Sequence, residues 1–310
     1  MKIIKIQEFD EDHIQKAAEL FVSSYEKQRE KTPILPKKKS LYDDVTTALT
    51  NKLGRRGFAA FEDGEMIGYM IETGSAENFM GKRTAFSLGL YSHSAVEDNR
   101  ERIYQKLYER LSDTWIKKGY HAHIFSFWAR DETLLFTLFR LGFGMTHFEL
   151  MRDLSLPEKV QTTISIRRLD TALPIKKLEM EHREYYPKAP LFWLPWEDYS
   201  FQEEFQGCLL GAYDGDKIVA YMHLKTDDAE TPLLASEDTC RVASAYAEHD
   251  YRGKGVGTAL LREAVLWAKE SDLKRLYVEG ESANIQGGNF WMKHFEPVVY
   301  TVRRCVDERI

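Results

Sequence analysis

Two similar segments lie at a constant offset in this sequence, and this repeat most constrains how the chain can fold. Residues 60–70 read AFEDGEMIGYM and resemble residues 212–222, AYDGDKIVAYM, at an offset of 152. Both place apolar residues around an acidic turn with glycine, which predicts a β-hairpin in each. The same offset relates Trp115 to Trp267, each within a helical pattern. A chain of 310 residues is long enough for two domains, so the repeat indicates two copies of one unit.

The order of elements within each copy predicts the fold class. Each copy reads as a strand, helices, a hairpin, a strand, a long helix, a strand, a helix and a strand. This order predicts a layered α+β fold in which helices cover both faces of a mixed, mostly antiparallel sheet. Residues 152–159, RDLSLPEK, are polar and contain a proline, which is typical of a linker. We therefore expect two domains, at residues 1–155 and 164–310.

Charge and apolar patterning limit the partners of the chain. The net charge is −6, and acidic and basic residues balance over residues 1–160, so the excess acid lies in residues 161–310. A nucleic-acid-binding domain usually has the opposite bias. We expect no membrane span, because no run approaches the roughly 18 apolar residues required, and the acidic N-terminus does not read as a signal peptide. Three dispersed cysteines, Cys208, Cys240 and Cys305, predict reduced thiols in the cytoplasm.

The strongest local signal is a glycine-rich segment at residues 246–258, YAEHDYRGKGVGT. It follows a plausible strand at 241–247 and begins an amphipathic helix, whose apolar residues are Leu260, Leu261, Ala264, Val265 and Ala268. Glycines at a helix start let a ligand approach the backbone, and the helix dipole attracts an anion. Arg252 and Lys254 add positive charge. The segment therefore predicts a phosphate or pyrophosphate site, although a simple turn before a helix has the same pattern. Its spacing excludes a Walker loop and fits a dinucleotide loop poorly.

With these residues in view, the segment resembles the loop of the GCN5-related N-acetyltransferase (GNAT) superfamily, Arg/Gln-x-x-Gly-x-Gly/Ala. Arg252, Gly255 and Gly257 match that pattern. Residues 276–279 resemble the strand that follows it in the family. The family then places an Asn, an apolar residue and often a Tyr where this chain has Asn284, Phe290 and Trp291. The resemblance covers most of residues 164–310.

The resemblance implies acetyl-coenzyme A (acetyl-CoA) as cosubstrate, with no metal, in a sheet that splays between its fourth and fifth strands. The pantetheine would bond to the backbone near Ala245, Tyr246 and Ala247, and the pyrophosphate to the amides of residues 253–258. The implied cofactor-binding residues are Ala245, Tyr246, Ala247, Arg252, Gly253, Lys254, Gly255, Val256, Gly257, Thr258, Asn284 and Trp291.

The first copy resembles the same fold without its cofactor loop. At the offset of 152, Arg252 corresponds to Arg100, but Gly255 corresponds to Ile103 and Gly257 to Gln105. Side chains at these positions would block a pyrophosphate. An active domain with an unusual loop remains the alternative.

The candidates for chemistry follow from the needs of acetyl transfer, in which an amine loses a proton and a thiolate leaves. Glu279 is the candidate base, because some peptide-amine acetyltransferases of this family carry a glutamate at that strand position; a surface or paired glutamate is the alternative. Weaker candidates are Glu237, Asp238, Glu281 and His249. Trp291 stands in place of the usual general-acid Tyr, and an indole cannot practically give up its proton. Other possible proton donors are Tyr246, Tyr300 and His294.

Two further groups of residues have competing interpretations. The aromatic, proline-containing stretch at 185–196 lies where the family has its acceptor loop, so we expect it to line the acceptor pocket or to pack between the copies. His121 and His123 share one face of a predicted strand. No third metal ligand is identifiable, so we expect these side chains to pack in the core rather than to bind a metal ion.

Three functions remain at this point. The first is an N-acetyltransferase that moves an acetyl group from acetyl-CoA directly to a primary amine of a small molecule or peptide. The acidic second half predicts a cationic acceptor for it, unless the acid only aids solubility. The second is a catalytically weak CoA-binding sensor. The third is an aminoacyl transferase that uses charged tRNA, against which the acidic second half argues.

Overall fold

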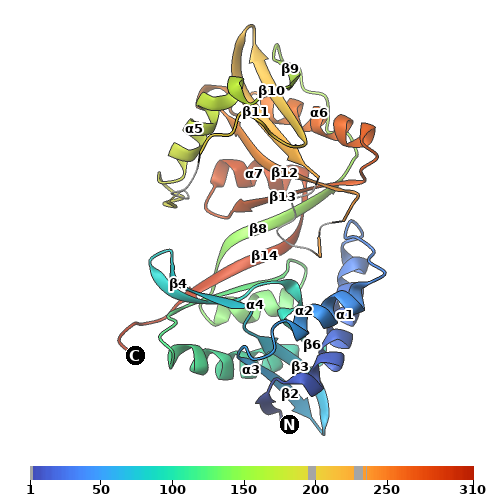
Figure 1. Ribbon diagram of the computed structural model, residues 1–310, viewed down its shortest axis with the longest axis vertical. Helices are drawn as coiled ribbons and strands as arrows, with labels where there is room; N and C mark the ends of the chain where they lie inside the picture. Colours follow the sequence, from blue (N-terminus) through green and yellow to red (C-terminus); the bar gives the residue numbers. More distant parts are fainter. Residues whose placement is uncertain (1–2, 195–199, 227–232, 235) are drawn as a thin grey trace. The chain divides into compact units, whose positions relative to one another are not determined.

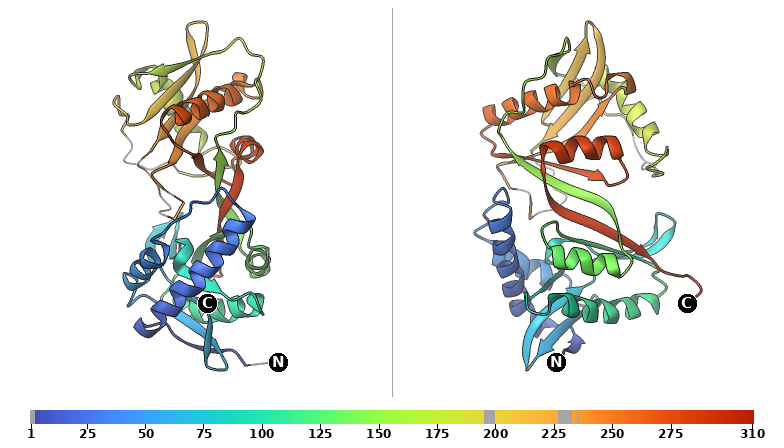
Figure 2. Two further views of the ribbon diagram at one scale, coloured as in Figure 1. Left: turned by 90° about the vertical axis from the view of Figure 1, so that its right-hand side faces the viewer. Right: turned by 180° about the vertical axis from the view of Figure 1, so that it is seen from behind.

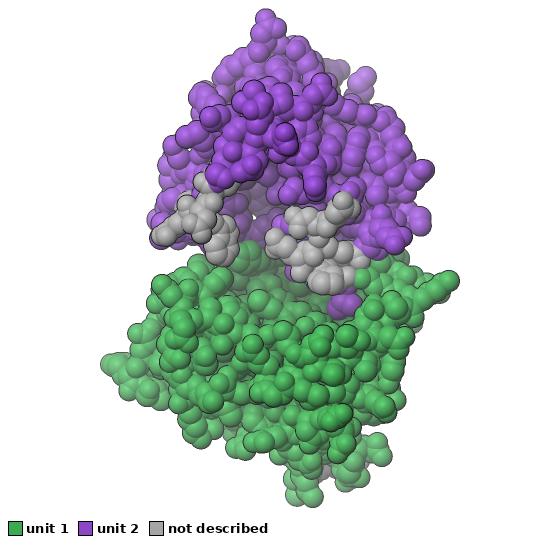
Figure 3. Space-filling view, viewed as in Figure 1, with its two compact units in different colours: residues 1–148, 298–310 green, residues 149–297 purple. Residues whose placement is uncertain are grey.

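The computed structural model describes residues 3–194, 200–226, 233, 234 and 236–310, and the chain divides into two compact units (Figure 3). Unit 1 comprises residues 1–148 and 298–310, and unit 2 comprises residues 149–297. Among the described residues, no helix has the combined length and apolar character that crossing a bilayer requires.

The C-terminal residues belong to unit 1 because of a strand pair. Strand β14 (Glu296–Cys305) runs antiparallel to β7 (Ala122–Trp128), with residues 299–305 opposite residues 122–128. Periodicity within a strand does not reveal its partner, so the domains expected at 1–155 and 164–310 placed this segment with the second copy.

Unit 1 holds two sheets and four helices among its described residues (Figure 1). The first sheet has the order β1-β2-β3-β6, and all of its pairs are antiparallel. The second has the order β4-β5-β7-β14, in which β5 and β7 are parallel. The bounds are β1 Lys5–Glu8, α1 Ile14–Lys31, α2 Leu41–Thr50, β2 Gly57–Glu62, β3 Glu65–Ile71, β4 Gly74–Phe79, β5 Lys82–Ser87, β6 His93–Ala95, α3 Arg100–Ile116, α4 Glu132–Arg140 and β8 Gly144–Asp153, whose last residues lie in unit 2.

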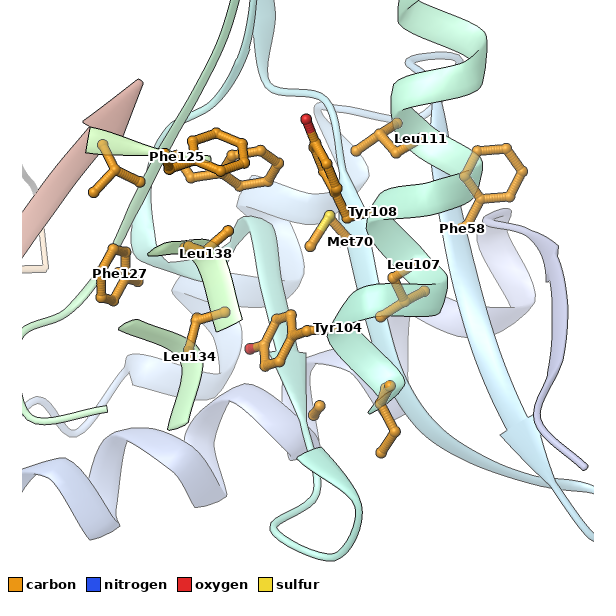
Figure 4. Close-up of a cluster of buried hydrophobic side chains, with 14 of the residues drawn as sticks. Phe58, Met70, Tyr104, Leu107, Tyr108, Leu111, Phe125, Phe127, Leu134 and Leu138 are labelled. Carbon is orange, nitrogen blue, oxygen red and sulfur yellow. The ribbon is translucent and has the colours of Figure 1, made fainter. Parts of the chain in front are cut away.

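The core of unit 1 forms around α3, whose apolar residues recur at helical spacing. Its buried residues Ile103, Tyr104, Leu107, Tyr108, Leu111 and Trp115 form a cluster with side chains of β2, β3, β7 and α4 (Figure 4). Trp115 is fully buried, and its indole N–H donates to the Glu72 carboxylate at 2.8 Å. Arg56 pairs with the same carboxylate at 2.5 Å and Arg55 at 3.5 Å, so the buried charge has three partners.

Unit 2 is built on the five strands β9-β10-β11-β12-β13, in that order (Figure 2). The β12–β13 pair is parallel and the others are antiparallel. Helix α6 packs against β10 and β11, and its five predicted apolar positions are all buried. The bounds are β9 Ser165–Leu169, a 3₁₀ turn at Leu173–Ile175, α5 Lys176–Tyr185, β10 Cys208–Asp214, β11 Lys217–Lys225, β12 Thr239–Ala247, a 3₁₀ turn at His249–Tyr251, α6 Val256–Glu270, β13 Arg275–Glu281 and α7 Ile285–His294.

The two units share a detail that confirms the repeat. Hairpin β2–β3 shifts register between Ala60 and Phe61, and hairpin β10–β11 shifts between Ala212 and Tyr213. These positions are equivalent at the offset of 152, so each copy has the same irregularity at the same place. Unit 1 also contains a second hairpin, β4–β5, between β3 and β6 in the sequence. The sequence predicted only one hairpin in each copy. Each strand has six residues, and β4 has no fully buried residue, so the hairpin gives a weak alternating pattern.

Candidate active site

The glycine-rich segment forms the start of α6 in a conformation that only glycine adopts readily. Gly255 is the N-cap residue, with φ of 81° and ψ of −3°, and Gly253 has φ of 74°. The N-cap makes no side-chain hydrogen bond, and the first turn contains no acidic residue. The first amides of the helix therefore remain available to an anion.

A cavity of about 430 Å³, here called the cofactor cavity, lies beside this helix start. It brings together eight of the implied cofactor-binding residues: Ala245, Tyr246, Ala247, Arg252, Gly253, Gly257, Asn284 and Trp291. Its other lining residues are His182, Tyr185, Tyr221, Met222, Tyr251, Leu260, Gln286, Gly287, Asn289 and Phe290.

The remaining four implied residues lie on the loop but outside the lining of that cavity. Lys254 and Val256 line a separate hollow with residues 161–164. A Cβ atom on Gly255 would lie 3.2 Å from the Val160 side chain. The Thr258 hydroxyl lies 3.5 Å from Nε2 of His294.

The sheet of unit 2 opens at the cofactor cavity. The β12–β13 pair runs only from Thr239 opposite Arg275 to Arg241 opposite Tyr277, whereas β12 continues to Ala247. Strand β12 also shifts register against β11 between Val242 and Ser244, a β-bulge that turns the strand. The splay that the resemblance implied between the fourth and fifth strands is therefore present.

Arg252 ties the end of β12 to the start of α7. Its Nε donates to the Ala247 carbonyl at 2.9 Å, and its Nη1 donates to Oε1 of Gln286 at 2.6 Å. Its guanidinium also lies 5.1 Å from the ring centre of Tyr185 and 5.2 Å from that of Tyr246. The arginine thus forms part of the wall of the cavity through contacts with three elements.

Asn284 and Trp291 both belong to α7, but in different roles. Asn284 is the N-cap residue, and its Oδ1 accepts from the Gly287 amide at 3.1 Å. This bond uses the side chain to start the helix. Trp291 stacks edge-on with Phe290 and Phe295, at 4.8 and 5.5 Å between ring centres.

Glu279 lies on β13 in an ion pair with Arg241 of β12, and 28% of its side chain is exposed. It is absent from the lining of the cofactor cavity. Tyr277 and Glu281 share its face of the strand by alternation. Burial raises the pKa of Glu281, whose carboxylate also accepts a hydrogen bond from Tyr186. The hydroxyl of Tyr277 donates to Glu149 at 2.8 Å, and burial raises its pKa.

The weaker candidates for chemistry are scattered. Asp238 pairs with Arg275 at 2.7 Å and Lys274 at 3.1 Å, and these cations draw its pKa down against burial. Glu237 and Asp238 precede β12, so they lie at the opposite end of that strand from the loop. His249 is exposed. Burial lowers the pKa of His294. Tyr300 belongs to unit 1, where its ring packs near Phe127.

Sequence reasoning missed His182, which lines the cofactor cavity from α5. Its ring stacks on Tyr246 at 5.3 Å, and its Nδ1 lies 3.3 Å from the hydroxyl of Tyr221. Burial, with a smaller contribution from the charge of Arg252, lowers the pKa of His182 to about 4. No motif marks this residue. Its helical spacing of four and seven from the buried Leu178 and Ile175 was the available signal.

The aromatic stretch contributes Tyr185 to the cofactor cavity. The Trp193 amide donates to the Tyr186 carbonyl at 2.9 Å, whereas Phe192 and Leu194 are exposed. Pro195 and Trp196 lie outside the described residues.

In unit 1 the equivalent of the loop is filled. Helix α3 begins at Arg100 itself, whereas α6 begins four residues after Arg252. Ile103 is fully buried, and its Cγ2 lies 2.8 Å from the position that a Cβ on Gly68 would take. Gln105 bonds to Glu101 one turn earlier. Among its described residues, unit 1 therefore has no counterpart of the glycine-containing loop that precedes α6 in unit 2.

The histidine pair in unit 1 falls into two environments. His123 is buried in β7, and its ring bonds to the Tyr108 hydroxyl at 2.8 Å and the Tyr120 carbonyl at 3.1 Å. His121 directly precedes the strand. Across the part of the chain that the structure describes, no group of three or more His, Cys, Asp or Glu residues is arranged to hold a metal ion.

Comparison with known proteins identifies the class. Residues 174–295 match the family model described as acetyltransferase (GNAT) family. A GCN5-related N-acetyltransferase from Sphaerobacter thermophilus has a similar fold over 97% of this chain and 95% of its own, with a TM-score of 0.55 and 12% identity. The GCN5-related glucosamine N-acetyltransferase region of a fungal multi-domain GH3 beta-N-acetylglucosaminidase aligns over 98% of this chain and 38% of its own, with a TM-score of 0.51 and 12% identity.

One curated relative matches over a short stretch. Streptothricin acetyltransferase A of Bacillus subtilis (strain 168) is 51% identical over 45 residues, which are 14% of this chain and 26% of that enzyme. The match thus spans about a quarter of the relative's length. The family match shows that unit 2 contains a GNAT domain at residues 174–295.

Proposed function

We propose that unit 2 is an N-acetyltransferase that moves an acetyl group from acetyl-CoA directly to a primary amine of a small molecule or peptide. The observation that carries this proposal is the uncapped start of α6, which adjoins a cavity at the splayed end of β12. A polyanionic ligand fits the free amides there. A flexible arm fits the opening between the strands, where backbone groups near Ala245 and Ala247 line the wall.

The reaction needs three events, and the chain offers groups for each. The amine nitrogen loses a proton and bonds to the carbonyl carbon, the carbon–sulfur bond breaks, and the departing thiolate takes a proton. Backbone N–H groups at the open edge of β12 would polarise the carbonyl oxygen. The arrangement of Arg252 against Gln286 would keep α7 in place while the ligand binds.

For the base we propose Glu279, with Glu281 as the nearest alternative. The ion pair with Arg241 fixes the position of the Glu279 carboxylate, and a water molecule would have to bridge it to the amine. Trp291 lines the cavity where the resemblance implies a Tyr, so we propose that water or another donor protonates the thiolate.

The alternative is a catalytically weak protein that binds CoA and acts as a sensor. The Trp291 substitution and the engagement of Glu279 by Arg241 favour it. Both proposals require that the chain binds acetyl-CoA, but only the first requires that it catalyses acetyl transfer.

One experiment separates them. Isothermal titration with acetyl-CoA measures binding, and a thiol assay then follows release of CoA with a panel of amines that includes streptothricin and glucosamine. Binding with amine-dependent thiol release supports the transferase. Binding without release from any amine supports the sensor, and absence of binding refutes both.

A further inference from the structure

A second cavity in unit 2, here called the polar cavity, lies on the face of the sheet that α5 covers. Its volume is about 530 Å³. It is lined by Ala172, Ile175, Glu179, Ser200, Gln202, Glu204, Phe205, Gln206, Leu209, Tyr221, His223, Lys225 and Ser244. None of the sequence-based candidates for chemistry is among these residues, so the cavity has no role in the function as proposed so far.

Tyr221 connects the polar cavity to the cofactor cavity. Its side chain lines both, and only 1% of the residue is exposed. Its hydroxyl lies 2.8 Å from Oγ of Ser244, which lines the polar cavity, and 3.3 Å from Nδ1 of His182, which lines the cofactor cavity. The two cavities therefore share this side chain in their walls.

The direction of these hydrogen bonds depends on the tautomer of His182, and the tautomer whose Nδ1 accepts gives the following arrangement. Burial keeps the pKa of this histidine near about 4, so the ring is neutral at pH 7 and its Nδ1 can accept. When Tyr221 donates to Nδ1, its oxygen accepts the Ser244 proton. Ser244 then presents only oxygen lone pairs to the polar cavity, which suits an N–H donor.

The charges of the polar cavity point to the same kind of ligand. Glu179 and Glu204 contribute two carboxylates against the single ammonium of Lys225. His223 lies opposite Ser244 in the β11–β12 pair; burial lowers the pKa of His223, and Glu179 opposes this shift with a small contribution. Ile175, Phe205 and Leu209 add an apolar wall.

We propose that the polar cavity binds the acceptor, and that the acceptor is a compact cationic amine with an apolar portion. This inference rests on the proposed function. Ser244 accepts a hydrogen bond from the amine, Glu179 attracts its positive charge, and His182 and Tyr221 act as positioning residues that orient Ser244. The amine then reaches the cofactor cavity beside Tyr221.

The charge selectivity of the cavity can be tested before any acceptor is known. Ser244→Cys places a thiol in the cavity, which is treated with 2-aminoethyl methanethiosulfonate, a cation, and 2-sulfonatoethyl methanethiosulfonate, an anion. Mass spectrometry measures the labelling rate at that thiol separately from Cys305, which is exposed in the parent. Because a thiolate by itself favours the cationic reagent, the ratio of the two rates is divided by the ratio measured with a free small-molecule thiol.

We expect the cation to react at least about fivefold faster after this correction, and Glu179→Gln in the same background to reduce that ratio. Glu184→Gln is the matched control, because Glu184 lies exposed on the same helix and outside the polar cavity. Equal corrected rates for the two reagents, or an equal effect of both glutamine substitutions, would overturn the proposal.

A second measurement uses the acceptor found by the thiol assay. Glu179→Gln should raise the KM for the acceptor about tenfold and leave the KM for acetyl-CoA unchanged, whereas Glu184→Gln should leave both unchanged. Tyr221→Phe should raise the acceptor KM as well. If the parent releases thiol but none of these variants changes the KM for the acceptor, the polar cavity is not the acceptor site. The proposed function would still stand. Failure of the parent to release thiol with any amine would instead refute the proposed function.

Discussion

Arg100 and Arg252, which lie 152 residues apart, each donate a hydrogen bond to the backbone carbonyl group five residues earlier in the chain. Each also reaches the start of the helix that follows the next strand, where Arg100 pairs with Asp131 at 2.6 Å and Arg252 bonds to Gln286 at 2.6 Å. The two units therefore use the same arginine to join a strand end to a helix start. Only in unit 2 do glycines lie between that arginine and the helix that follows it. The arginine contacts that both units share are therefore independent of the glycine-rich loop.

This relationship predicts the stoichiometry of binding. We expect one acetyl-CoA per chain, bound in unit 2, because Ile103 and Gln105 take the places of the two loop glycines in unit 1. Isothermal titration measures the number of sites. Two equivalent sites would show that side chains at these positions do not exclude the ligand.

Gly255→Glu should abolish acetyl-CoA binding while the chain remains folded. The residue has φ of 81°, its added Cβ would lie 3.2 Å from Val160, and a carboxylate at a helix start repels a pyrophosphate. Titration with acetyl-CoA measures the affinity, and circular dichroism measures folding.

The matched control for this change is Gly215→Glu. Gly215 has φ of 60° in the β10–β11 turn, and a Cβ there meets nothing within 4 Å. This variant adds the same charge and a comparable backbone cost, roughly 1–2 kcal/mol, away from the loop. Equal losses of affinity in the two variants would mean that strain, rather than the loss of an anion site, explains the first result.

The elements with strong periodicity could be predicted from the sequence, and the cavities could not. The α6 pattern and the repeated hairpins identified the fold because burial requires apolar residues at fixed spacing. His182 and Tyr221 escaped prediction because they meet only when α5 packs on the sheet, and neither belongs to a motif. The pairing of β14 with β7 was equally hidden, since the order of strands in a sheet is a property of tertiary packing.

The partners of the acidic residues near the splayed strands could not be predicted from the sequence either. The excess acid of residues 161–310 suggested a field that would attract a cation, but two of its members near the splay are neutralised, since Asp238 is paired with Arg275 and Glu279 with Arg241. Sequence spacing does not reveal these partners because each pair joins two strands. The carboxylates that line the polar cavity, Glu179 and Glu204, come from a helix and a loop that the charge argument had not considered.

Glu279→Gln should lower turnover about 10²–10⁴-fold with little change in acetyl-CoA affinity. The amide can still accept a hydrogen bond from Arg241, so the fold should be retained while the base is lost. Single-turnover kinetics and titration measure the two quantities. Glu281→Gln is the comparison variant. A Glu279→Gln enzyme as fast as the parent across pH would move the role to Glu281 or to water.

The rate of acetylation should fall as salt is added. The net charge of −6 resides in residues 161–310, and a cationic acceptor should be drawn toward this part of the chain at low ionic strength. Salt screens that attraction, so the second-order rate constant for the acceptor should fall between low and high ionic strength. The KM for acetyl-CoA, measured in parallel, separates this effect from weaker cofactor binding. A rate constant that rises with salt would contradict a cationic acceptor.

Unit 1 should lose stability as the pH falls below about 6.5, because two of its buried histidines are held neutral. Burial is the main cause that lowers the pKa of both His93 and His123 to about 4. An unfolded chain protonates its histidines near a pKa of about 6.5, so between about pH 4 and pH 6.5 the unfolded state binds more protons than the folded state. The free energy of unfolding should therefore fall by up to about 1.4 kcal/mol per pH unit for each histidine, a change that urea titrations at several pH values measure.

Single substitutions identify the histidines that take up these protons. Both rings have the same hydrogen-bonding pattern, with one nitrogen against a tyrosine hydroxyl and the other against a backbone carbonyl. Replacing either histidine with Gln should reduce the pH slope by about one proton, and the double substitution by about two. The comparison with the parent uses the pH slope of the free energy of unfolding and not its value at pH 7, because each substitution also disturbs packing. A double variant that retains the slope of the parent would show that other groups take up the protons.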